Sequence, residues 1–251
     1  MALQNGVLVH GPTSWGCAVR DDDGKLHVAS GWKPRLAPEA RQRPLLRGPI
    51  AIAEAFALLP TVRRALPHAR FPFERPAVLG SILATAAVGR ALRGSSLPPA
   101  RRELLAVGAA FLPAALSLRG PDLAAYHGAE HVSIGTYEAG GIRAPKEHPR
   151  CGSQLIPSLV ASTIAANAVA SKAPAGTRSL ARLLGLGAAV GGSVELFAWV
   201  ARNPSNPLAR ALARPGFELQ RRLSTAEPSD DQVEVADAAR DACLALEQQA
   251  R

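Results

Sequence analysis

The order of apolar and polar positions divides the chain into three parts. Residues 1–43 contain short apolar stretches separated by turn residues, a pattern typical of β-strands. The sequence Asp21-Asp-Asp-Gly24 favours a tight hairpin turn, and residues 25–30 alternate as a returning strand. We therefore expect residues 1–43 to form a small N-terminal β-hairpin segment.

Residues 44–202 have a helical pattern with four long apolar runs, paired by two short basic segments into two hairpins that a longer segment connects. The runs are Ala77–Leu92, Leu104–Leu118, Leu155–Ser171 and Leu183–Ala201. A membrane-spanning helix needs about 20 apolar residues, and these runs are somewhat shorter. The residues that interrupt them are Arg90, Pro113, Asn167 and Glu195. The pattern predicts a helical membrane core of two hairpins with about four spans; buried helices of a soluble bundle are the alternative.

Residues 203–251 form a polar C-terminal tail that is rich in proline at its start. Ser229 is a candidate N-cap for a helix from about Asp231 to Gln249. Apolar residues recur along this helix at helical spacing, namely Val233, Ala236, Ala239, Cys243 and Leu246. We expect an amphipathic helix that packs one face against the rest of the protein. The whole chain is thus expected to be mainly α-helical.

The composition favours a membrane partner over nucleic acid. Hydrophobic residues make up 47% of the chain but aromatic residues only 4%, which suits helices packed through small side chains. The net charge is +9, yet the basic residues are scattered singly or in pairs and lack interleaved aromatics. We therefore expect anionic membrane lipids as partners and no nucleic acid. A homo-oligomer is compatible with the pattern, which does not fix the oligomeric state.

The expected location is a membrane facing a reducing compartment. The three cysteines, Cys17, Cys151 and Cys243, are odd in number and far apart, so they do not indicate a disulfide framework. Residues 1–9 have neither the basic start nor the cleavage site of a secretory signal peptide. If both hairpins span, the two termini and the segment between the hairpins share one side. We expect that side to be cytoplasmic.

The candidate chemistry lies between the hairpins, in a central segment covering residues 120–154. The motif Tyr126-His-Gly-Ala-Glu-His131 follows a good helix start at residues 121–122. On a helix, His127 and His131 share a face, with Glu130 beside them. This is the spacing of inverted zincins, in which two histidines bind zinc and the glutamate is a general base for water. We predict a divalent metal site, with zinc as the expected ion and Glu130 as the catalytic base.

Further ligands are needed to complete such a site. His148 and Cys151 follow a glycine- and proline-containing loop that can fold back, and their spacing suits two ligands on one turn. Glu195 is another candidate, because an ionisable residue in an apolar helix usually faces an interior site. The five-residue motif alone is a weak signal. The clustering of three histidines and a cysteine within 25 residues is stronger evidence for a metal site. The alternative is that these groups are hydrogen-bonded structural residues of the loop.

Several blocks of residues carry a resemblance to a known family. They are Asn5-Gly-Val-Leu-Val-His-Gly-Pro-Thr-Ser-Trp15, Leu46-Arg-Gly48 with Glu54, Tyr126–His131, Tyr137-Glu138, His148-Pro-Arg-Cys-Gly152, Pro215–Gln220 and Thr225–Glu234. In these blocks the chain resembles the YqhQ-like family of bacterial membrane proteins, a family of unknown function described as predicted metal-dependent enzymes. The resemblance implies an integral protein of the bacterial inner membrane with about four helices, and a metal without a defined reaction.

The chain departs from the family pattern at its opening. Leu8, Val9 and His10 replace two methionines and an arginine, and Asn5 replaces a glutamate, while the metal set is intact. The sequence thus predicts a membrane-associated metal-binding protein, with metal-dependent hydrolysis as the reaction class. One alternative is a non-catalytic membrane protein with a structural zinc site. The other is a transporter or metal-handling protein with Glu195 and Asn167 along its path.

Overall fold

Strands from the N-terminus and a helix from the C-terminus pack against each other. The computed structural model describes residues 1–117 and 120–250. Its sheet is antiparallel with the order β1-β2-β3-β4. The strands are β1 (Ala2–Leu3), β2 (Gly6–His10), β3 (Ser14–Arg20) and β4 (Leu26–Trp32). The predicted hairpin is confirmed, because Arg20 pairs with Leu26 across the Asp21–Gly24 turn; β1 and β2 extend it to four strands.

Helix α9 (Asp230–Gln249) covers one face of this sheet, as its apolar spacing predicts. Ser229 caps the helix by accepting a hydrogen bond from the Gln232 N–H, and the Gln232 side chain accepts one from the Ser229 N–H. Ala236, Ala239 and Cys243 are buried toward the strands. The contact is so close that a Cβ atom on Gly16 of β3 would lie 2.2 Å from the carbonyl oxygen of Ala239. The C-terminal tail and the N-terminal segment therefore share one core.

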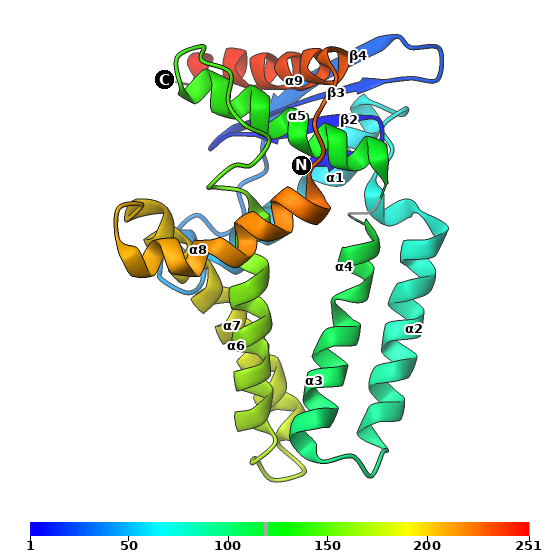
Figure 1. Cartoon of the computed structure of the whole chain (residues 1–251), viewed down its shortest axis with the longest axis vertical. Coiled ribbons are helices and arrows are strands. Elements are labelled where there is room, and N and C mark those ends of the chain that lie inside the picture. Colours follow the sequence, from blue (N-terminus) through cyan, green and yellow to red (C-terminus); the bar gives the residue numbers. More distant parts are fainter. Residues whose placement is uncertain (118–119, 251) are drawn as a thin grey trace.

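Two more helices complete the part that we call the head, which consists of the sheet, α1, α5 and α9. Helix α5 (Pro121–Glu138) packs beside α9 and contacts β1 and β2. Helix α1 (Arg47–Ala65) contributes Leu58 and Val62 to a second buried cluster that includes Trp15 and Phe71. Figure 1 shows α9 and α5 side by side at one end of the molecule.

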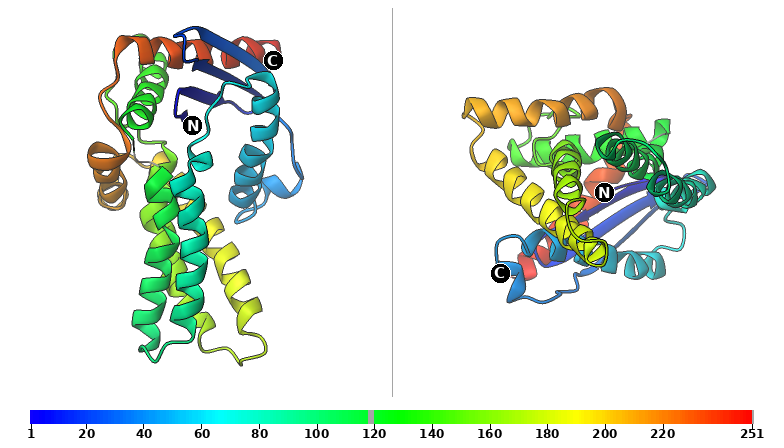
Figure 2. Two further views of the ribbon diagram at one scale, coloured as in Figure 1. Left: turned by 90° about the vertical axis from the view of Figure 1, so that its right-hand side faces the viewer. Right: turned by 90° about the horizontal axis from the view of Figure 1, so that it is seen from below.

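The remaining long helices form two hairpins that project from the head and that we call the stem (Figures 1 and 2). The first hairpin consists of α2 (Pro76–Arg93), α3 (Pro99–Ala110) and α4 (Leu112–Ser117). The second consists of α6 (Leu155–Ala170) and α7 (Arg178–Arg202). The predicted run Leu104–Leu118 is divided between α3 and α4, and its last residue lies outside the described residues.

Two helices among the described residues are long and apolar enough to cross a membrane, namely Gly152–Ala170 and α7. Helix α2 is apolar but shorter, so four spans are not confirmed. Only 11% and 17% of the residues in the two apolar windows are buried. Core helices of soluble proteins bury most of such a window, so this exposure disfavours the soluble-bundle alternative.

A further amphipathic helix, α8 (Pro207–Leu219), connects the stem to the head. Asn206 caps it by accepting hydrogen bonds from the N–H groups of Leu208 and Ala209, and Pro207 occupies the first turn. A π-helical turn at Gln220–Ser224 follows and returns the chain to α9. Short 3-10 turns occupy Ala40–Gln42, Pro72–Glu74 and Gly152–Gln154.

Candidate metal centre

Helix α5 presents His127 and His131 on one face. The residues are one turn apart, and their ring centroids lie 4.5 Å from each other. His131 is buried, and His127 is half-buried. The helical reading of the Tyr126–His131 motif is therefore confirmed, and it puts both imidazoles in reach of one ion.

Cys151 joins the two histidines from the segment that follows α5. Gly140 and Gly141 have φ values of +66° and +99°, which residues with a side chain rarely adopt, and they turn the chain back after the helix. The Cys151 Sγ atom lies 3.2 Å from Nε2 of His127. One donor atom from each of the three side chains lies within 4.8 Å of the others. This triad of His127, His131 and Cys151 could hold a metal ion.

Backbone carbonyls fix how the two imidazoles are protonated. Nδ1 of His127 lies 2.7 Å from the carbonyl oxygen of Ser224, and Nδ1 of His131 lies 2.6 Å from that of Lys146. A carbonyl can only accept, so each Nδ1 carries the proton. In the neutral form of each ring, Nε2 therefore has a lone pair for a metal ion; in the protonated form, Nε2 carries a proton that it can donate to the Cys151 thiolate.

The electrostatics of the triad favour a thiolate. Burial raises the pKa of Cys151, but its hydrogen bonds to His127 and His131 outweigh burial and lower the pKa to about 5. Burial lowers the pKa of His127, and the bond to Cys151 with the nearby Glu130 raises it above its ordinary value. Thiolate and imidazole are the ligands that zinc prefers.

The triad also fits zinc in size. Tetrahedral zinc with ordinary Zn–N and Zn–S bonds places its donors about 3.3–3.7 Å apart. The His127–Cys151 distance of 3.2 Å is close to this range, and the other donor atoms lie within 4.8 Å of one another and would have to approach to bind one ion. Three protein ligands would leave a fourth position open, as in catalytic zinc sites.

His148 lies next to the triad but outside it. Its ring centroid is 5.7 Å from that of His131. Its Nε2 faces Glu138 Oε2 at 3.3 Å, and its Nδ1 accepts a hydrogen bond from the Arg150 N–H, also at 3.3 Å. Both ring nitrogens are thus occupied, and the structure does not bring His148 into the metal-binding group.

Glu130 adjoins the triad on α5. Its Oε1 atom accepts a hydrogen bond of 2.6 Å from the Met1 amino group. Burial raises the pKa of Glu130, but the Met1 amino group and the two imidazoles of the triad together lower it below its ordinary value. The carboxylate is therefore ionised, as a base must be.

The prediction of Glu195 as a ligand is not supported by its position. Glu195 lies on α7 and accepts hydrogen bonds from the Arg47 guanidinium and, at 3.2 Å, from the Leu45 N–H. These contacts join α7 to the start of α1. An ionisable group in an apolar helix signals an interior partner, and here that partner is an arginine of another helix.

Sequence reasoning missed the residues that hold the centre in place. Gln220 exchanges two hydrogen bonds with the His148 backbone, at 2.8 Å and 3.2 Å. Ser224 contributes the carbonyl that orients His127. Both belong to the π-helical turn after α8. The available signal was the block Pro215–Gln220, which carries the family resemblance but indicates no role for Gln220, and Ser224 had none.

Residues 122–246 match the model of a family described as "Protein of unknown function (DUF1385)". The chain carries a DUF1385 domain. No curated protein and no solved structure shows a significant match to the chain. The DUF1385 domain begins in α5 and ends in α9, so it contains the triad, α6, α7 and α8. The match to this family agrees with the predicted resemblance to an uncharacterised family. The YqhQ-like name stays a prediction.

Proposed function

We propose that this protein is a membrane-embedded zinc protein whose metal centre catalyses hydrolysis at the membrane surface. The observation that carries the proposal is the convergence of His127, His131 and Cys151. Cys151 comes from a different element than the histidines, and both imidazoles are held in the ligand tautomer. These features support a resident divalent ion over a chance cluster.

A catalytic role is favoured over a closed structural site. A structural zinc site needs four protein ligands. His148 lies beside the triad and could be a fourth ligand, but its ring nitrogens are engaged by Glu138 and Arg150. When bound, the ion would supply Lewis acidity and activate water. Glu130 would accept the proton from that water, since its carboxylate is ionised and adjoins both histidines.

The transporter alternative has weaker support. It requires Glu195 to face a path between the hairpins, but Arg47 and Leu45 take up its carboxylate. These contacts indicate that Glu195 anchors α7 to α1 and does not bind a transported substrate. We therefore do not propose transport.

Insertion of the stem into a membrane is supported by its exposed apolar side chains. Among them are Leu79, Leu83, Leu104, Leu105, Val169, Leu180, Leu183 and Leu184. Water disfavours many exposed apolar side chains on one group of helices, whereas lipid does not. Helix α7 is about 37 Å long, α2 about 27 Å and α6 about 24 Å, against about 30 Å of hydrocarbon. We infer that both hairpins insert, the shorter helices with local thinning of the bilayer.

The metal centre would then lie on the head side of the membrane. Both termini belong to the head (Figure 1), so they would share that side with the triad. We propose that the membrane is the bacterial inner membrane and that the head is cytoplasmic, where thiols stay reduced. A cysteine-reactive, membrane-impermeant reagent applied to intact cells would label a Ser205→Cys variant if the head were outside.

The decisive experiment combines metal analysis with a hydrolysis screen. The protein purified in detergent should contain about one zinc per chain. Glu130→Gln should retain zinc and the circular dichroism spectrum of the wild type, and should lose the hydrolysis of any ester, peptide or phospholipid substrate that the wild type cleaves. Asp122→Asn, an exposed change on the same helix, is the matched control. A folded wild type without metal would overturn the proposal; metal without hydrolysis would leave only its metal-binding part.

A further inference from the structure

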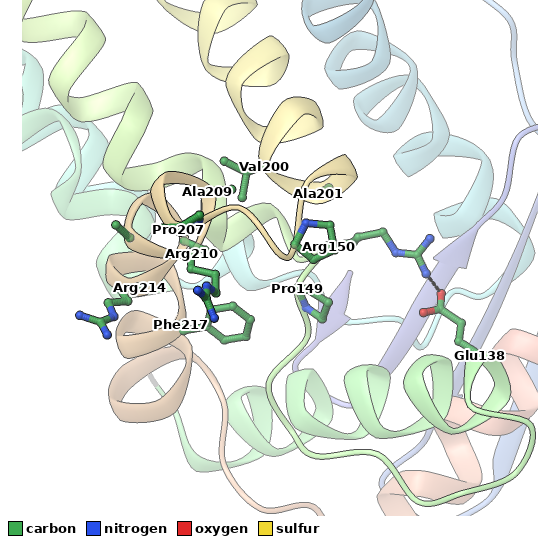
Figure 3. Close-up of a pocket in the computed structure, with 13 residues that line it drawn as sticks. Glu138, Pro149, Arg150, Val200, Ala201, Pro207, Ala209, Arg210, Arg214 and Phe217 are labelled. Atoms are coloured by element: carbon green, nitrogen blue, oxygen red, sulfur yellow. Dashed lines mark ion pairs between the residues drawn. The ribbon is translucent and has the colours of Figure 1, made fainter.

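A cavity of about 980 Å³ lies between the end of α7, helix α8 and the segment that leads into Cys151 (Figure 3). Its apolar wall includes Val200, Ala213 and Phe217. On the opposite side it is lined by Pro149 and Arg150, which directly precede Cys151. The cavity is large enough for part of a sizeable ligand. Two of its lining residues directly precede the triad residue Cys151 in the sequence.

The cavity has an excess of positive charge. Three arginines and one glutamate line it, namely Arg150, Arg210, Arg214 and Glu138. Arg150 is neutralised by an ion pair with Glu138. Arg210 and Arg214 are exposed, and no acidic partner for either is found in the part of the chain that the structure describes. In Figure 3, Arg210 lies beside the Phe217 ring, while Arg150 extends to Glu138.

The position of α8 indicates which anion would meet these arginines. The helix follows directly on α7, a candidate span, and crosses its end at the junction of stem and head (Figure 1). Leu208 and Leu212 of α8 are exposed. A basic amphipathic helix with exposed leucines is typical of the lipid head-group region, where the nearest anions are phospholipid phosphates.

We propose that this cavity binds one anionic phospholipid. The phosphate would interact with Arg210 and Arg214, and an acyl chain would lie along the wall that Phe217 and Val200 form. Guanidinium groups suit this task because they donate two parallel hydrogen bonds to a phosphate. The inference rests on the membrane insertion that we propose above, and it names the class of lipid that would lie next to the metal centre. It does not require the metal.

The test uses the full chain in a nonionic detergent, titrated with phosphatidylglycerol, phosphatidylcholine or inorganic phosphate and followed by native mass spectrometry. We expect one phosphatidylglycerol to bind saturably and more tightly than phosphatidylcholine. The double variant Arg210→Gln, Arg214→Gln should weaken this binding at least about tenfold. The control Arg202→Gln, Arg222→Gln removes the same charge from exposed positions on either side of α8 that do not line the cavity. It should change binding less than about twofold.

A second variant separates a cavity from a merely basic surface. Ala213→Trp keeps every arginine and fills space along the apolar wall, so it should weaken phosphatidylglycerol binding as the arginine variant does. Circular dichroism checks that each variant folds. Equal weakening by both arginine pairs, equal binding of the two lipids, or equally tight binding of inorganic phosphate would overturn the proposal.

The outcome is separable from that of the metal proposal. Cys151→Ala should lose zinc and still bind phosphatidylglycerol through the cavity. Zinc without specific lipid binding in the wild type would overturn the lipid site alone, and lipid binding by a metal-free wild type would overturn the metal centre alone.

Discussion

The Sγ atom of Cys151 lies 3.2 Å from Nε2 of His127, although the two residues are 24 positions apart. The contact closes a loop that begins inside α5 and passes through the turn at Gly140 and Gly141. Ser224 holds the opposite nitrogen of His127 from a third element, the turn after α8. The candidate centre therefore depends on the packing of three segments, namely α5, the segment that leads into Cys151 and the turn after α8.

Removal of one triad residue should release the metal, whereas removal of the neighbouring histidine should not. We expect His127→Ala and Cys151→Ala to lower zinc affinity beyond the roughly 10- to 100-fold that loss of an orienting partner costs. His148→Gln should lower it less than about tenfold, because both ring nitrogens of His148 bind protein groups outside the triad. Elemental analysis after dialysis against a weak chelator measures the difference. A His148 variant as depleted as the His127 variant would make His148 a ligand.

Metal occupancy should fall with acidification in two stages. Ligands bind metal only when deprotonated. The pKa of His127 is raised above 6.5, so at limiting zinc protons should begin to compete on this residue above pH 6.5. Cys151, with a pKa of about 5, should be protonated in addition as the pH falls through 5. Zinc content measured across this range should decline first gradually and then steeply. Constant occupancy down to pH 4 would contradict the assignment of these ligands.

The carboxylate of Glu247 should stabilise the head by joining α9 to the turn before β3. It accepts four hydrogen bonds of 2.8–2.9 Å from the N–H and hydroxyl groups of Thr13 and Ser14. Burial opposes ionisation, but these bonds lower the pKa to about 2 from 4.5. A lowered pKa gives stability that is complete above 4.5 and is lost as the pH falls toward 2.

Glu247→Gln should therefore cost about 1–3 kcal/mol at neutral pH and less in acid. Glu234→Gln is the matched control, because Glu234 also links α9 to the sheet, through Arg20, but is 63% exposed. We expect the control to cost less than about 1 kcal/mol. Thermal unfolding in detergent, followed at several pH values, gives both results. An equal loss of unfolding free energy in the two variants would show that the hydrogen bonds to Thr13 and Ser14 do not stabilise the head beyond an exposed ion pair.

The sequence predicted those features that depend on local pattern. The Asp21–Gly24 turn, the α9 boundaries with their Ser229 cap, and the shared face of His127 and His131 all follow from spacing over a few residues. The spacing of apolar residues and the presence of capping residues indicate such local elements directly. The metal motif could be located for the same reason.

Features set by distant packing were not predictable. His148 has the spacing of a ligand, but Glu138 and Gln220 hold it beside the triad. Glu195 resembles a buried functional acid until Arg47 is found next to it. Which side chains become partners depends on which helices pack against each other. The periodic pattern of a single sequence does not contain this information.

Helix α2 provides the sharpest test of four spans. Leu83 lies near its middle and is 74% exposed. If α2 lies in lipid, Leu83→Asp puts a carboxylate into hydrocarbon, which costs about 2.5–3.5 kcal/mol at the centre of a span. We then expect a clear loss of protein from the membrane fraction. Leu223→Asp is the matched control, because Leu223 is 68% exposed but lies in the turn after α8. If α2 were in water instead, both changes would be harmless, because an exposed leucine on a soluble helix gains from becoming polar. Membrane fractionation and yield of the two variants therefore decide whether the first hairpin inserts with the second.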